Sequence, residues 1–81
     1  MKSEMMLEEA LRIVRNIIYE VNGTPVNNIK SNDSLITDLA MDSVELIDFI
    51  IRLEEVGVII KESQLSNVLT VEQIAQMLLA K

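Results

Sequence analysis

An aspartate and a serine, Asp42 and Ser43, stand directly before an acidic and apolar run that is typical of an amphipathic helix. Aspartate is a favoured N-cap residue, and Glu45 three positions later gives the pattern of a capping box. Ser43 would then lie in the first turn, where backbone N–H groups lack helical acceptors and the positive end of the helix dipole favours a negative substituent. The residues therefore predict an exposed hydroxyl that could carry a phosphate ester.

Catalysis by the chain itself is not expected, because no histidine is available as a base for Ser43. The chain also has no cysteine, and hence no thiolate nucleophile, no disulfide and no Cys-based zinc site. No glycine-rich phosphate loop and no set of metal ligands can be recognised, so we expect no metal site. These observations predict a protein that is not an enzyme.

The elements that must position Ser43 are predicted to be helices. The 81 residues suffice for a single domain, residues 1–81. Apolar residues make up 49% and aromatic residues 2% of the chain, so the core must consist of aliphatic side chains around Phe49. Two glycines and one proline are too few for a series of hairpins. The expected fold is all-α.

The net charge of −6 argues against binding to nucleic acids or anionic membranes and favours basic protein partners. No run approaches the roughly 20 apolar residues of a membrane span, and residues 1–4 do not begin an export signal. We therefore expect a monomer in the cytoplasm that does not insert into membranes.

Helix boundaries can be predicted at both ends of the chain. Ser3 is a candidate N-cap for a first helix over about residues 4–20, which should end at the Asn-Gly-Thr-Pro run of residues 22–25. Thr70 and Gln73 form a second capping-box pattern at the start of the last helix.

The long loop between the first helix and Met41 would deliver the serine, because a loop of this length in so small a domain is expected to be functional. Residues 58–65 are predicted to form a loop and a short third helix, since no partner strand is apparent. The expected architecture is a four-helix bundle with a short third helix and a long first loop.

The helix that follows Asp42 has more apolar residues than one core face needs. One stripe is assigned to the core: Leu46, Phe49, Ile50 and Leu53. Of these, Leu46, Ile50 and Leu53 are also expected to line an internal cavity. A second stripe is assigned to a partly exposed ridge: Val44, Ile47 and Ile51. Acidic residues flank this ridge: Asp42, Glu45, Asp48, Glu54 and Glu55. Such a surface is typical of a docking site for a protein with basic residues.

Several segments in this order resemble acyl carrier proteins: residues 34–39 (Ser-Leu-Ile-Thr-Asp-Leu), residues 42–45 (Asp-Ser-Val-Glu) and residues 53–55 (Leu-Glu-Glu). The resemblance covers essentially the whole chain. It implies that Ser43 receives 4'-phosphopantetheine from coenzyme A, placed there by a phosphopantetheinyl transferase that uses magnesium. The thiol of this arm would carry acyl groups as thioesters, which fits a chain without cysteine. The expected internal cavity would shelter part of a short acyl chain.

The resemblance also implies the binding partners. Asp42 and Glu45 would help to dock the transferase. Partner-recognition residues on the helix would be Val44, Ile47, Asp48, Ile51, Glu54 and Glu55. The partners would be acyl-transferring and synthase enzymes of fatty-acid, polyketide or specialised lipid biosynthesis.

The chain departs from the family pattern at Ala40, where glycine is common, at Lys61, where proline is frequent, and in a shorter turn over residues 55–58. Because of these departures, the sequence does not decide between fatty-acid, polyketide and specialised lipid biosynthesis. The alternative function is an unmodified acidic helical adaptor that binds a protein partner through the second helix.

Overall fold

The computed structural model describes residues 6–66 and 68–80, apart from the side chain of Glu62. Helix α1, Leu7–Asn22, turns an apolar stripe inward and buries Ala10, Leu11, Val14, Ile17 and Ile18. Its end is confirmed near the predicted site, because Gly23 adopts a left-handed conformation with φ 84° and donates its N–H to the Tyr19 carbonyl at 2.8 Å.

The beginning of α1 differs from the prediction. Met6 takes the N-cap position, and its N–H donates to Glu9 Oε1 at 3.1 Å. Ser3, the predicted cap, and Glu4, the predicted first helical residue, lie outside the described residues.

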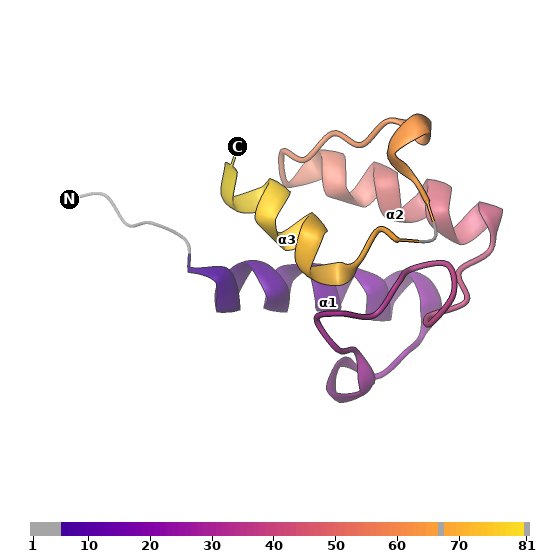
Figure 1. Cartoon of the computed structure of the whole chain (residues 1–81), viewed down its shortest axis with the longest axis horizontal. Coiled ribbons are helices and arrows are strands. Elements are labelled where there is room, and N and C mark those ends of the chain that lie inside the picture. The colour runs from indigo at the N-terminus through magenta and orange to yellow at the C-terminus, as the bar shows by residue number, and fades with distance from the viewer. Residues whose placement is uncertain (1–5, 67, 81) are drawn as a thin grey trace.

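Two further helices complete the α structure of the described residues: α2, Ser43–Glu55, and α3, Val71–Ala80. The predicted cap of α3 is confirmed, because Gln73 N–H donates to Thr70 Oγ1 at 3.2 Å and Thr70 N–H donates to Gln73 Oε1 at 3.0 Å. Helix α1 packs against both α2 and α3 (Figure 1), and the core lies between α1 and these two helices, together with apolar side chains of the connecting segments. Within the described residues, no helix is both long and apolar enough to cross a bilayer.

The long loop between α1 and α2 is anchored along its length. It contains a 3₁₀ turn, η1 (Val26–Asn28), and buries Ile29, Leu35 and Leu39 against the core. Ser34 N–H donates to Asp38 Oδ2 at 2.7 Å, which closes a turn in the loop. Arg15 Nε of α1 donates to the Ile29 carbonyl at 2.9 Å. The loop is therefore a packed element of the domain.

The same loop also supports the start of α3. The Val71 N–H donates to the Asp33 carbonyl at 3.0 Å, and the Glu72 N–H donates to the Ser31 carbonyl at 2.8 Å. These two N–H groups lie in the first turn of α3, where the helix itself offers no acceptor.

A four-helix bundle is not confirmed. In place of the predicted short third helix, the structure has a single 3₁₀ turn, η2 (Glu62–Gln64). Residues 58–60, shortly before it, form no helix, and Val58 and Ile60 are buried while Ile59 between them is exposed. Three consecutive β-branched residues disfavour a helix, and this alternation puts two of them into the core. The described residues therefore form three α-helices and two 3₁₀ turns.

Candidate functional site

Ser43 is the first residue of α2, and the predicted capping box before it is confirmed. The Glu45 N–H donates to Asp42 Oδ1 at 2.8 Å, and the Asp42 N–H donates to Glu45 Oε1 at 3.3 Å. Because these contacts fix the first turn, the Ser43 side chain is held outward and exposed. The hydroxyl is a primary alcohol that another protein can reach.

The turn before the serine contains an unusual backbone conformation. Ala40 has φ 55°, in the left-handed region where a side chain costs roughly 1–2 kcal/mol. It stands where the resemblance predicts glycine. Its neighbour Met41 is buried and donates its N–H to the Leu35 carbonyl at 3.1 Å. The loop thus holds Ala40 in a strained conformation three residues before Ser43.

Asn22, at the end of α1, connects this turn to α1 through side-chain hydrogen bonds. Its Nδ2 donates to Glu45 Oε1 at 3.0 Å and to the Leu39 carbonyl at 3.4 Å. Thr24 Oγ1 donates to Asn22 Oδ1 in turn. Sequence reasoning missed this role, because an asparagine before glycine at the end of a helix is an ordinary terminator. Nothing local indicates that its amide reaches the cap of α2.

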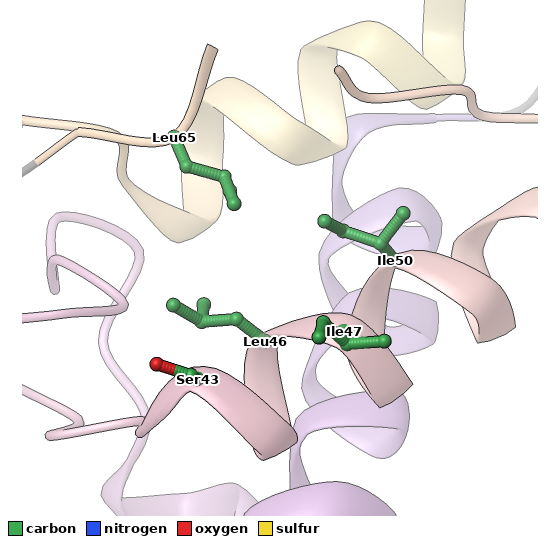
Figure 2. Close-up of a pocket in the computed structure, with 5 residues that line it drawn as sticks. All are labelled: Ser43, Leu46, Ile47, Ile50 and Leu65. Atoms are coloured by element: carbon green, nitrogen blue, oxygen red, sulfur yellow. The ribbon is translucent and has the colours of Figure 1, made fainter. Parts of the chain in front are cut away.

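A pocket opens beside Ser43, with a cavity volume of about 210 Å³. Figure 2 shows Leu46 and Ile50 extending from α2 toward Leu65, which comes from the segment before α3; Ser43 and Ile47 complete the lining. For comparison, an apolar cavity of roughly 150 Å³ holds a benzene molecule. The space is therefore large enough for a short apolar chain.

The predicted lining of the cavity is correct in part. Leu46 and Ile50 line the pocket and are half-buried. Leu53 does not line it, because it lies a full turn deeper and is completely buried in the core with Phe49. Leu65 was not predicted, since its place opposite α2 depends on the path of residues 58–70.

The second apolar stripe of α2 is exposed, as predicted. The exposed fractions are 75% for Val44, 54% for Ile47 and 52% for Ile51. Such values are high for aliphatic residues of a small domain, and the three side chains form a ridge along one face of the helix.

The acids around this ridge are not equivalent. Asp42, Glu54 and Glu55 are exposed, whereas Glu45 and Asp48 are half-buried and engaged within the protein. Three or more acidic residues in an arrangement suited to a metal ion do not occur among residues 6–66 and 68–80.

Asp48 is held by Arg52, one turn further along α2. Arg52 Nε donates to Asp48 Oδ1 at 3.1 Å, and its Nη1 contacts Glu20 Oε1 of α1 at 2.9 Å. The hydrogen bond and the negative charge of Asp48 raise the pKa of the Arg52 guanidinium above its ordinary value. Sequence analysis gave Arg52 no role.

Comparison with known proteins agrees with this geometry. A family model described as "Phosphopantetheine attachment site" matches residues 12–78. An acyl carrier protein from Saccharopolyspora erythraea is 32% identical over 73 residues, which cover 89% of this chain and 77% of that protein. An acyl carrier protein from Acidothermus cellulolyticus is 34% identical over 65 residues, which cover 79% of this chain and 77% of that protein. The chain therefore belongs to the acyl carrier protein family, whose members are carriers rather than catalysts and hold a covalently attached 4'-phosphopantetheine.

Proposed function

We propose that Ser43 is the attachment site of the phosphopantetheine arm. The observation that carries this proposal is the exposed hydroxyl of Ser43 on the first turn of α2, at the rim of an apolar pocket. The matched family region, residues 12–78, includes this serine. A transferase that approaches from solvent would reach the oxygen without unfolding any part of the domain.

The local electrostatics suit a phosphodiester at this position. The first turn of α2 presents N–H groups at the positive end of the helix dipole, which stabilises a negative group. Asp42 is bonded to the Glu45 N–H, so its carboxylate is directed to the backbone of its own helix. In the transfer, Ser43 Oγ would form the new bond to phosphorus, lose its proton to the transferase, and displace the nucleotide part of coenzyme A.

When bound, the arm supplies a thiol that holds an acyl group as a thioester, which is chemistry that a chain without cysteine lacks. The residues of the chain would shield part of the acyl group from solvent. Leu46, Ile50 and Leu65 offer an apolar lining to the first carbons of the acyl group, and the cavity of about 210 Å³ limits the sheltered part to a short chain.

The partners that we propose are a phosphopantetheinyl transferase and the acyl-transferring and synthase enzymes that load and unload the arm. The exposed ridge of Val44, Ile47 and Ile51 and the surrounding acids support a docking role for α2. The carrier would act as a cytoplasmic monomer in fatty-acid, polyketide or specialised lipid biosynthesis. The four-helix bundle with a short third helix remains a prediction; in this structure residues 62–64, where that helix was expected, form a 3₁₀ turn.

Intact-protein mass spectrometry tests the attachment site. The parent chain, Ser43→Ala and Ser63→Ala are incubated with coenzyme A, magnesium and a broad-specificity phosphopantetheinyl transferase. Ser63 is the matched control, since it is also an exposed serine but lies in η2. We expect the mass of one phosphopantetheine on the parent and on Ser63→Ala, and none on Ser43→Ala.

Modification of Ser43→Ala would show that another residue is the site. A folded parent that stays unmodified, while the transferase is active on a second carrier protein, would favour the alternative of an unmodified adaptor that docks through α2.

A further inference from the structure

Arg52 interrupts the negative charge of the α2 face. It is the only basic residue in the sequence of α2, and its guanidinium contacts both Asp48 and Glu20. A single fork of donors thereby engages one acid from α2 and one from α1. A partner's base that approaches either carboxylate therefore meets the positive charge of Arg52 beside it.

The remaining acids of the face lie at the two ends of α2. Asp42 and Glu45 stand at its beginning, where their hydrogen bonds come from neutral N–H groups and leave their negative charge uncompensated. Glu54 and Glu55 are exposed at its end. At a rise of 1.5 Å per residue, the midpoints of these two pairs lie roughly 16 Å apart along the helix axis. The exposed side chains of Ile47 and Ile51 lie between them.

From this arrangement we propose that Arg52 is a specificity-determining residue of the carrier: it withdraws Asp48 from partners and divides the docking face into two acidic ends. The face then fits a protein whose basic side chains form two groups about 16 Å apart on either side of an apolar surface. This inference rests on the proposed carrier function and states which partners the α2 face selects.

The physical basis is discrimination by charge. A partner with a basic residue over the middle of α2 would meet the like charge of Arg52 and would have to displace it from Asp48. A partner with bases at the two ends avoids this contact. Because the charges concerned are at the rim of the interface, the effect should lie mainly in the association rate and should weaken with salt.

The test compares two acids of the same face in two backgrounds. Asp48→Asn and Glu54→Gln each remove one negative charge, and each is made in the parent and in Arg52→Gln. The probe is a broad-specificity phosphopantetheinyl transferase, and the readout is kcat/KM for modification of Ser43 at low and at high ionic strength. Circular dichroism and thermal melting show whether each variant is folded.

In the parent background, we expect Glu54→Gln to lower kcat/KM about threefold at low salt and Asp48→Asn to lower it less than twofold, since Asp48 is already engaged. Arg52→Gln should raise kcat/KM about threefold, because it frees Asp48 and removes a like charge. In the Arg52→Gln background, Asp48→Asn should lower kcat/KM by the same factor as Glu54→Gln. High salt should reduce all these differences.

Lys30→Gln is the matched control for net charge, because Lys30 is an exposed cation in the loop before α2. An equal gain from Lys30→Gln and Arg52→Gln would overturn the inference, because the effect would then belong to the whole molecule. Equal effects of Asp48→Asn and Glu54→Gln in the parent, including no effect of either, would also overturn it. This comparison does not depend on the folding of an Arg52 variant.

Failure of the carrier proposal would look different. A folded parent that an active transferase cannot modify would remove the proposed function, and the inference with it. Modification of every variant at the same rate would remove the inference alone and leave the carrier function intact.

Discussion

Helices α1 and α3 differ from α2 in how they use their apolar side chains. Helix α1 buries five residues and the ten-residue α3 buries four, whereas the thirteen-residue α2 buries only Phe49 and Leu53. The remaining apolar residues of α2 either line the pocket or lie exposed on its ridge. Most apolar residues of α2 are therefore available for ligands and partners, whereas the buried apolar residues of α1 and α3 hold the domain together.

The largest effect should come from the part of α2 that does belong to the core. Phe49→Ala removes a fully buried aromatic side chain and should lower the free energy of unfolding by about 3–5 kcal/mol. Ile51→Ala, on the exposed ridge of the same helix, should change it by less than about 0.5 kcal/mol. Urea unfolding followed by circular dichroism measures both. Similar losses in the two variants would contradict the division of α2 into a core face and a free ridge.

A smaller effect should come from filling the pocket. With the carrier loaded, a hexanoyl group should make the domain about 1–2 kcal/mol more stable than an acetyl group, since each buried CH₂ contributes at most about 0.8 kcal/mol and the pocket is partly open. Thermal unfolding of the two loaded forms measures the difference. Leu65→Ala, which removes one wall, should reduce it. Equal stability of the two forms would mean that the acyl chain stays in solvent.

The smallest effect should come from the turn before Ser43. Ala40→Gly relieves the left-handed conformation at φ 55° and should stabilise the domain by about 0.5–1 kcal/mol, after the entropy of the added glycine is subtracted. Ala10→Gly, the same substitution at a buried position in α1, should destabilise it by about 1 kcal/mol or more. Urea unfolding measures both changes. A loss of stability in Ala40→Gly would show that the methyl group is favourable where it stands.

Local patterns predicted the features that depend on neighbouring residues. The capping boxes at Asp42 and Thr70 and the glycine end of α1 are all confirmed, because each is formed within four residues of the chain. The exposure of the α2 ridge was also predicted, since helical periodicity separates Ile47 and Ile51 from the side of Phe49.

Contacts between distant segments could not be predicted in this way. Asn22 reaches Glu45 across 23 positions, and Arg52 reaches Glu20 across 32. Leu65 faces the pocket directly after the 3₁₀ turn η2, in a segment where a short α-helix was predicted. In each case the three-dimensional path of the chain decides which groups meet, and a single sequence does not contain that path as a local signal.

The contacts that Val71 and Glu72 make with the loop have a consequence for the dynamics of the domain. Their amide protons are bonded to the carbonyls of Asp33 and Ser31, so they exchange with solvent only when the loop detaches from α3. The loop and the first turn of α3 therefore open as one cooperative unit, although some 40 positions separate them in the chain. Deleting residues 31–33 would remove both carbonyl acceptors and release the first turn of α3, and the hydrogen-exchange rates of these two amides would report it.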